Sequence, residues 1–388
     1  MADLENNLIE DVVPAKFIDQ PIEKRGSNET ISSPSEHLSR CFEINVQYTE
    51  EIHRFRIVSV CLSNRKSAIV FRSYDDFVSL HQHLVEVTEP HVVIPPLPDM
   101  FDYNERKISS EQLKIIKKLK ISYNNVIEFG KYLSSIGSHP VLCLNDRFDH
   151  FLMDESFFPP TSITNKLKTY SILKLVSNKW KTNHRDCDDF YECERNFTSE
   201  YDLKMQAVVN DFQTFLISNG KLSNVLGHLS TCVTSALIVN VSQPETVNFM
   251  KAFTSNLDLY KIYLDVNETV THRSLGVILQ YFYAYNSSYK LMLSNRTDLM
   301  IKYENSNKNY QRNLGSSKAE MAYEEKEQIG EEFKNFSDKA RFEIKRYHSN
   351  RSLGMVNSIN DYARSQLEML RHTVTLLKSS ISDLKSNL

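Results

Sequence analysis

Hydrophobic positions divide the chain into a front part with period-two patterning and a back part with helical periodicity. Apolar residues alternate with polar ones over 42–48, which is typical of a half-buried β-strand. A second strand is predicted over 55–62 and a third over 69–71, joined by the polar turn 64–67. The front part therefore begins as three short strands.

Helical spacing follows these strands over 76–86, 111–136 and 146–153. Three strands followed by helices predict an α+β domain with a three-stranded antiparallel sheet, which we place at residues 39–156. The preceding segment, 1–38, is polar and contains several prolines, and we expect it to be a disordered arm.

The back part predicts very long helices. Only Pro244 follows Pro160, and proline is the residue that most strongly breaks helix interiors. We expect helices over 186–240, 244–314 and 317–388, each roughly 80–105 Å long at 1.5 Å per residue. Apolar residues in the last one step by three and four from Val356 to Leu388, as in a coiled coil. Residues 186–388 are thus predicted to form an elongated all-α, three-helix coiled-coil domain.

Composition narrows the function classes. The 388 residues are 41% hydrophobic, which is enough for folded cores, and the net charge of −3 gives no global attraction to nucleic acid. The six cysteines are scattered, which indicates reduced thiols. No apolar run is long enough to span a membrane. Because no glycine-rich phosphate loop, GxSxG motif or zinc spacing is found, we expect no enzyme activity, cofactor or metal.

Two segments carry a resemblance to a known family. Residues 69–77 lead from a strand into the turn Arg72-Ser73-Tyr74, and 93–98 form a proline loop, Val-Ile-Pro-Pro-Leu-Pro. This order resembles the PX domain, a phosphoinositide-reading membrane module. The helical half, including 342–348 and 367–377, resembles the BAR domain of PX-BAR sorting nexins. The resemblance covers about 41–388.

The resemblance implies a lipid headgroup site, but this chain lacks basic residues that the family has there. The family places two arginines and a tyrosine where this chain has Arg72, Ser73 and Tyr74, and the second arginine grips the 3-phosphate. A guanidinium suits phosphate because its donors form a fork, whereas a serine carries no charge. Family basic positions also align with Met100 and Asn125. We therefore expect a weakened or absent 3-phosphoinositide pocket.

Two interpretations of this region stay open. Arg72, Arg106 or Lys107 supplies the missing charge if the alignment register is shifted. The proline loop is an internal loop, or instead a ligand for SH3-type domains. In the family the loop dips into the bilayer, which implicates Met100, Phe101 and Tyr103, although plain loop packing explains them equally well.

Basic and amphipathic segments are the other candidates for membrane contact. The linker 157–185 is predicted to be a basic amphipathic helix, either in a membrane interface or packed between the domains. Its apolar side comprises Leu167, Tyr170, Leu173, Val176 and Trp180. The predicted basic membrane patch comprises Lys114, Lys117, Lys118, Lys120, Lys302, Lys308, Arg312, Lys339, Arg341, Lys345 and Arg346. Ordinary helix solubility is the alternative for these charges.

The expected function is a peripheral scaffold on the cytoplasmic side of endosomal membranes. It would bind anionic or phosphoinositide membranes, dimerise through the long helices with another PX-BAR nexin or a second copy, and sort cargo in retrograde or autophagy-related recycling traffic with coat proteins. The alternative is a protein-interaction adaptor that uses the PX fold without binding lipid. The sequence does not choose the cargo or the partner.

Overall fold

The strands and helices follow the predicted pattern. The computed structural model describes residues 42–49, 53–62, 65–98, 127–156, 185–240 and 244–386. The predicted disordered arm and linker helix, and most of the predicted helix 111–136, lie outside these residues. The domain boundaries at 38, 156 and 185 accordingly stay predictions.

The front domain is built on a three-stranded antiparallel sheet in the order β1-β2-β3, as predicted. Its strands are β1 (Phe42–Thr49), β2 (Arg54–Cys61) and β3 (Ser67–Arg72). Val46 pairs with Ile57, which pairs with Val70, and these three side chains are buried on one face. The alternation read from the sequence therefore identifies the buried face correctly.

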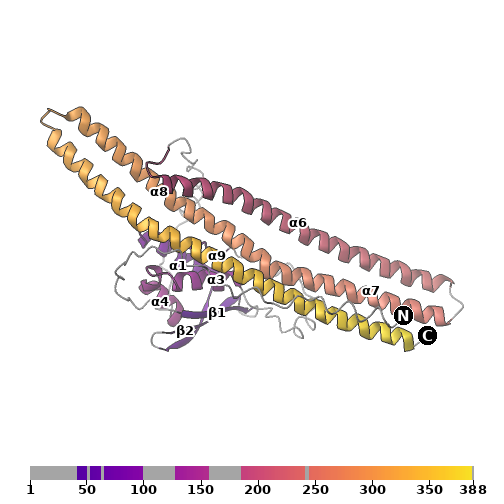
Figure 1. Ribbon diagram of the computed structural model, residues 1–388. Coiled ribbons are helices and arrows are strands. Elements are labelled where there is room, and N and C mark those ends of the chain that lie inside the picture. The colour runs from indigo at the N-terminus through magenta and orange to yellow at the C-terminus, as the bar shows by residue number, and fades with distance from the viewer. Residues whose placement is uncertain are drawn as a thin grey trace, which may run out of the picture. The chain divides into compact units, whose positions relative to one another are not determined.

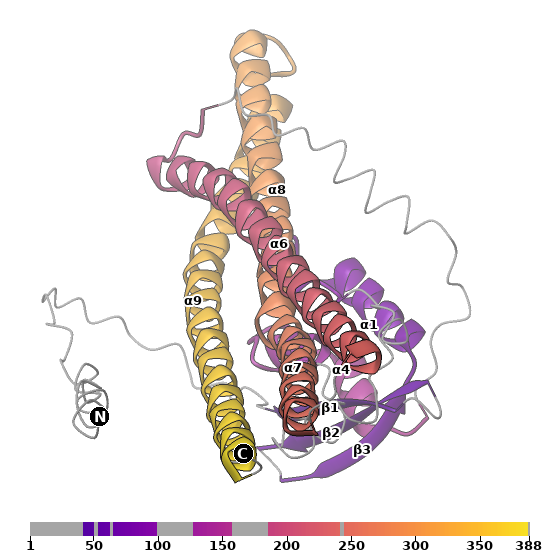
Figure 2. The same ribbon diagram turned by 90° about the vertical axis from the view of Figure 1, so that its right-hand side faces the viewer.

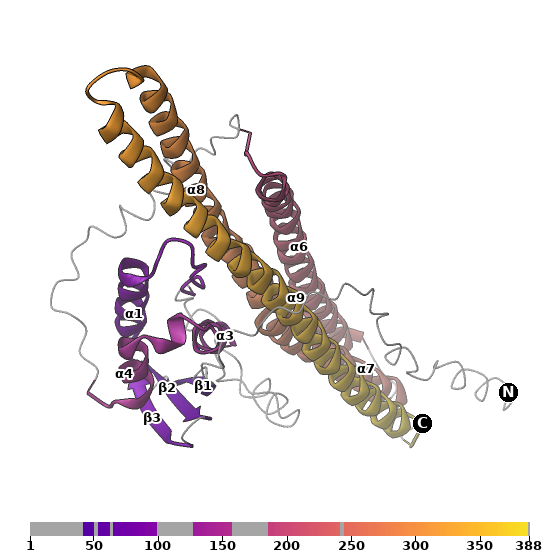
Figure 3. The ribbon, with the colours of Figure 1, turned by 60° about the vertical axis from the view of Figure 1, so that its left-hand side comes forward.

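Helices α1 (Tyr74–Val87), α3 (Ile127–Gly137) and α4 (Asp146–Met153) lie together on one side of this sheet (Figure 3). A short 3₁₀ turn, η2 (Leu142–Leu144), precedes α4. Aromatic rings hold the layer together, because the Phe77 ring lies 4.9 Å from the rings of both Phe129 and Phe151. All three rings are fully buried.

The back part consists of long helices, as predicted: α6 (Asp189–Asn240), α7 (Pro244–Thr271), α8 (Val277–Asn313) and α9 (Ala319–Ser386). In Figures 1 and 2, α9 runs beside α8 and then beside α7. At 1.5 Å per residue the 68 residues of α9 span about 100 Å.

The predicted helix 244–314 differs in one respect, because a five-residue π-helix, η3 (His272–Gly276), separates α7 from α8. Periodicity does not predict such a segment, since it adds one residue to a single turn. The Gly276 backbone approaches α6 closely here, and a Cβ at this position would lie 2.7 Å from the Phe212 ring.

The apolar seam of α9 is covered over only half its length. Its upstream residues Phe336, Ala340, Ile344 and Tyr347 are buried, and Tyr347 stacks on Tyr289 of α8 with 4.4 Å between ring centroids. The downstream residues are about half exposed. We call them the α9 stripe: Val356, Ile359, Leu367, Leu370, Val374 and Ile381. Within this chain, the seam is therefore well covered only in its upstream part.

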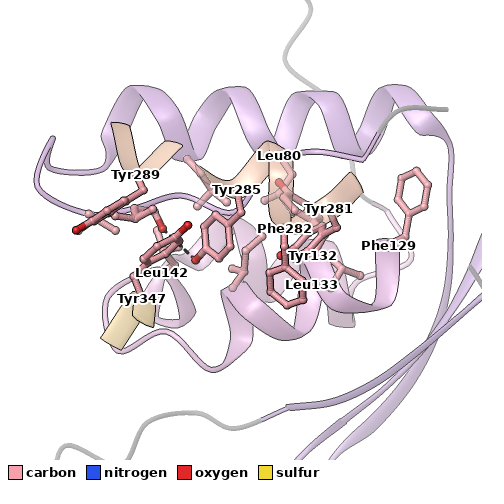
Figure 4. Close-up of a cluster of buried hydrophobic side chains, with 14 of the residues drawn as sticks. Leu80, Phe129, Tyr132, Leu133, Leu142, Tyr281, Phe282, Tyr285, Tyr289 and Tyr347 are labelled. Atoms are coloured by element: carbon pink, nitrogen blue, oxygen red, sulfur yellow. Dashed lines mark hydrogen bonds between the residues drawn. The ribbon is translucent and has the colours of Figure 1, made fainter. Parts of the chain in front are cut away.

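Residues of the front domain and of α8 and α9 share one apolar cluster (Figure 4). Tyr281 and Tyr285 of α8 lie among Tyr132, Leu133 and Leu142 in this cluster, and all of these side chains are buried. The Ser135 hydroxyl lies 3.0 Å from the Tyr281 hydroxyl. Side chains of both domains therefore exclude water from the same core.

Candidate functional site

Ser73, which the resemblance aligns with the family's phosphate-binding arginine, caps helix α1. The Ser73 hydroxyl accepts from the Asp76 backbone N–H at 3.3 Å, and the Ser73 N–H donates to the Asp76 carboxylate at 2.7 Å. These reciprocal bonds form a capping box. Ser73 therefore has a local structural role that suffices to explain a serine at this position.

Arg72 is buried and its guanidinium is used inside the domain. Its Nε donates to the Phe151 carbonyl at 2.9 Å, and its Nη2 donates to the carbonyls of His150 and Asp154. The guanidinium also lies 5.4 Å from the centre of the Phe151 ring. Burial lowers the pKa of Arg72, although the charges of Asp76 and Asp154 oppose this shift. Arg72 thus joins β3 to the end of α4, which argues against its supplying the missing phosphate contact.

Tyr74 connects the same turn to the proline loop. Its hydroxyl donates to the Pro98 carbonyl at 3.3 Å, and its ring meets the Phe129 ring edge-on at 6.2 Å. Residues 93–98 are part of the described fold, and Val93 is fully buried. The segment is therefore an internal loop rather than a detached polyproline ligand.

Most of the remaining predicted site residues lie outside the described residues. This applies to Met100, Phe101, Tyr103 and Asn125, to the lysines of 114–120 and to the apolar side of the linker. Their proposed membrane roles stay predictions.

A polar cluster that sequence reasoning missed centres on Glu343 of α9. Its buried carboxylate accepts from the Val93 backbone N–H at 2.9 Å and from Arg346 Nε at 2.9 Å. His139 Nε2 lies 3.3 Å from the same carboxylate. The periodicity of α9 places position 343 beside the seam, but no local pattern pairs it with residues about two hundred positions earlier.

The hydrogen bonds of His139 fix its protonation. Its Nδ1 accepts from the N–H groups of Val141 at 3.0 Å and Leu142 at 3.2 Å, so the proton resides on Nε2 and is donated to Glu343. Burial lowers the pKa of His139, and the bond to Glu343 offsets this only partly. Burial would raise the pKa of Glu343, but the bonds from His139 and Arg346 outweigh it and lower that pKa to about 2. His139 thus holds the backbone turn that follows it and links this turn to α9.

The predicted basic patch on α9 is largely paired. Lys339 Nζ lies 2.8 Å from Glu89, Arg341 Nη2 lies 2.8 Å from Asp188, and Arg346 bonds to Glu343. Lys345 is exposed. The pairs reduce the charge that these residues present to an anionic surface.

The α8 members of the patch face acidic neighbours. Lys302, Lys308 and Arg312 are exposed, but ring contacts between Tyr303 and Phe333 and between Tyr310 and Tyr323 place this part of α8 beside 323–333 of α9. The stretch of α9 near this end is rich in glutamate: Glu320, Glu324, Glu325, Glu327, Glu331 and Glu332. Further along, 273–318 packs beside 334–351, since Tyr289 stacks on Tyr347 and Arg296 Nε donates to the Ser337 hydroxyl. The basic residues of 273–318 that lie there, Lys290 and Arg296, pair with Asp202 and Asp186.

Comparison with known proteins shows which families and proteins this chain resembles. Residues 61–155 match the model of the PX domain. Sorting nexin-6 of Homo sapiens is 21% identical over 82% of this chain and 84% of its own length. Sorting nexin-32 of Mus musculus is 20% identical over 81% of this chain and 84% of its own length. These matches support the resemblance of this chain to the PX-BAR sorting nexins.

Other similarities to sorting nexins cover different lengths. Sorting nexin-4 of Mus musculus is 26% identical over 43% of this chain and 36% of its own length. The cryo-EM structure of the SNX-BAR Mvp1 tetramer is similar with a TM-score of 0.42 and 13% identity, covering 88% of this chain and 99% of that one. The match to the PX model and the sequence similarity to sorting nexins confirm the resemblance drawn from the sequence.

Two further points concern metal ions and membrane spans. Among the described residues, no group of three or more histidine, cysteine or carboxylate side chains could hold a metal ion. No helix in that part is both long and apolar enough to cross a bilayer.

Proposed function

We propose that this chain acts as a sorting nexin, a non-enzymatic peripheral membrane scaffold that dimerises through its long helices. The observation that carries the proposal is the α9 stripe, whose members Val356, Leu370 and Ile381 are 54%, 52% and 52% exposed. A continuous exposed apolar stripe on a long helix is characteristic of an interface. A second stripe on α6 comprises Val208, Phe215, Leu222, Val225 and Leu229, each more than one-third exposed.

Membrane binding in this proposal relies only weakly on the PX headgroup site. Ser73 caps a helix and Arg72 is committed to backbone carbonyls, so neither supplies the bidentate contact that holds a 3-phosphate. Anionic lipid would instead be met by exposed lysines and by a partner subunit. Each basic side chain near an anionic surface contributes about 1 kcal/mol.

The proposed partner is another PX-BAR nexin with an intact headgroup site, and a homodimer is the alternative. Such a dimer would attach to endosomal membranes, support their tubulation and sort cargo in retrograde or recycling traffic, including autophagy-related recycling. Support for this role comes from the PX domain and from the similarity to sorting nexins.

The buried Arg72 also favours a second candidate, an adaptor that docks proteins and does not bind lipid. The two functions separate in a vesicle flotation experiment with the full chain. Vesicles of neutral lipid, of neutral lipid with phosphatidylserine, and of that mixture with phosphatidylinositol 3-phosphate are compared, with and without a second PX-BAR nexin. The scaffold floats with anionic vesicles in at least one arm, whereas absence from every vesicle fraction selects the adaptor.

A further inference from the structure

The proline loop is fixed at both ends by different parts of the molecule. At its start, the Val93 N–H donates to Glu343 of α9, and the Val93 carbonyl accepts from the Tyr285 hydroxyl of α8 at 3.5 Å. At its end, the Pro98 carbonyl accepts from the Tyr74 hydroxyl. The proline loop therefore connects the turn at 72–74 of the PX domain to the long helices α8 and α9.

Glu343 is the acceptor on which this arrangement depends. It is 6% exposed and receives hydrogen bonds from Val93, His139 and Arg346. Val93 and His139 belong to two separate segments of the PX domain, so one carboxylate links both to α9. If the carboxylate is removed, the buried Val93 N–H and the His139 Nε2–H lose this acceptor.

The neighbouring contacts between the loop region and the helices are of a different kind. Lys339 pairs with Glu89, but both side chains are substantially exposed, and such pairs contribute little. Asn295 Nδ2 donates to the Pro90 carbonyl at 3.2 Å, also at the surface. The His91 ring meets the Phe336 ring edge-on at 6.1 Å. These three contacts help the loop region to pack against the helices. Glu343 differs from them because it is a buried acceptor, and it therefore specifies where the loop begins.

We propose that Glu343 is a positioning residue: from the helical domain it sets the position of the proline loop and, through Pro98, of Tyr74 at the PX headgroup site. Orientation of the PX site is thereby coupled to the helices that form the dimer. The consequence for lipid binding rests on the proposed function, while the position of the loop does not.

Hydrogen–deuterium exchange of the full chain tests the positioning directly. In Glu343→Ala, exchange of the non-proline amides in 93–98 and 139–144 is expected to speed up roughly tenfold or more, because the Val93 N–H and the His139 ring lose a buried charged acceptor. Exchange in α6–α9 and the native mass should stay as in the wild type. Glu332→Ala is the matched control, because Glu332 is an exposed glutamate on the same helix. It should leave 93–98 unchanged.

Glu343→Gln keeps the side-chain size and one acceptor oxygen, so a smaller acceleration in the same segments is expected. It also provides the test if the alanine variant does not fold. Unchanged exchange in 93–98 in the folded variants overturns the proposal.

Flotation with vesicles containing phosphatidylserine and phosphatidylinositol 3-phosphate provides the functional arm. Any gain in binding that phosphatidylinositol 3-phosphate gives over phosphatidylserine alone should be lost in Glu343→Ala, while binding to phosphatidylserine vesicles and the native mass stay unchanged. If the wild-type chain binds no vesicle, the proposed function fails, and the exchange result alone decides the positioning role.

Discussion

Ser73 and Arg72 are adjacent in sequence, yet the sequence reveals the role of only one of them. The resemblance already points to the departure at Ser73, and an Asp three residues later is compatible with a capping box. The guanidinium of Arg72 is taken up by the carbonyls of Phe151 and Asp154, about eighty positions later in the chain. No local sequence pattern indicates this pairing. A long-range acceptor therefore decides whether an arginine is available to a ligand.

Ser73→Arg restores the family charge but also removes the cap. We expect a loss of about 0.5–2 kcal/mol in unfolding free energy from the cap alone. Ser73→Ala is the control, because it removes the cap without adding charge. Both variants should show similar urea midpoints, and only Ser73→Arg should gain binding to phosphatidylinositol 3-phosphate vesicles. Equal vesicle binding by the two variants would show that the surrounding pocket does not hold the lipid.

Arg72→Met should destabilise the front domain by about 1–3 kcal/mol, because several buried carbonyls lose their donor. Arg54→Met is the control, since Arg54 is exposed at the start of β2. Urea unfolding followed by intrinsic fluorescence measures both. A midpoint for Arg72→Met equal to that of Arg54→Met would mean that the guanidinium contacts contribute nothing net.

At the scale of elements, period and proline content predicted the sheet and the long helices because both depend on local pattern. Local pattern does not indicate the η3 segment or how far along α9 its apolar seam is covered within the chain. Coverage depends on where neighbouring helices end, and position 356 onward carries the same heptad pattern as position 336 although only the latter is buried. The Glu343 cluster was missed because its partners are distant in the chain.

The crossing of α8 and α9 depends on a glycine. A Cβ at Gly354 would lie 2.6 Å from Cζ of Phe282, a ring that is 4% exposed and packed in the core. Gly354→Ala should therefore lower stability by about 1–3 kcal/mol despite its better helix propensity. Gly130→Ala in α3 is the control, because its Cβ would meet nothing within 4 Å. Thermal melts should move in opposite directions, and a stabilising Gly354→Ala would contradict this packing.

At the scale of the whole molecule, buried histidines make stability depend on pH. Burial lowers the pKa of His81 to about 4, with Nδ1 3.2 Å from the Tyr132 hydroxyl. Its unfolded-state pKa is about 6.5, so the unfolded chain binds more protons below that pH. Stability should therefore fall from pH 6.5 to 4, by up to about 3 kcal/mol for His81. His139 acts in the same direction.

Glu343 adds a second window, because its pKa of about 2 lies below the ordinary glutamate value. Its contribution is complete above about pH 4.5 and is lost as the pH falls towards 2. Urea unfolding at several pH values separates the stability contribution of His81 from that of Glu343. The variants compared are His81→Gln and the exposed-site control His228→Gln. His81→Gln should flatten the dependence between pH 6.5 and 4. If the unfolding free energy of His81→Gln depends on pH as steeply as that of His228→Gln, His81 does not contribute to the pH dependence.

The α9 stripe leads to the prediction that concerns assembly. We expect the native mass of the purified chain, alone or with a second PX-BAR nexin, to be that of a dimer, which for the homodimer is twice 45.1 kDa.

Leu370→Glu combined with Val374→Glu places charge in the exposed stripe and should yield monomer with unchanged helix content, because burying an unpaired carboxylate is costly. Glu368→Gln with Arg371→Gln, on the same turns, is the matched control and should remain dimeric. Since both stripe positions are already about half exposed in the single chain, the glutamate pair should not unfold it. A wild-type chain that stays monomeric with every nexin partner would leave the stripe without the role proposed for it.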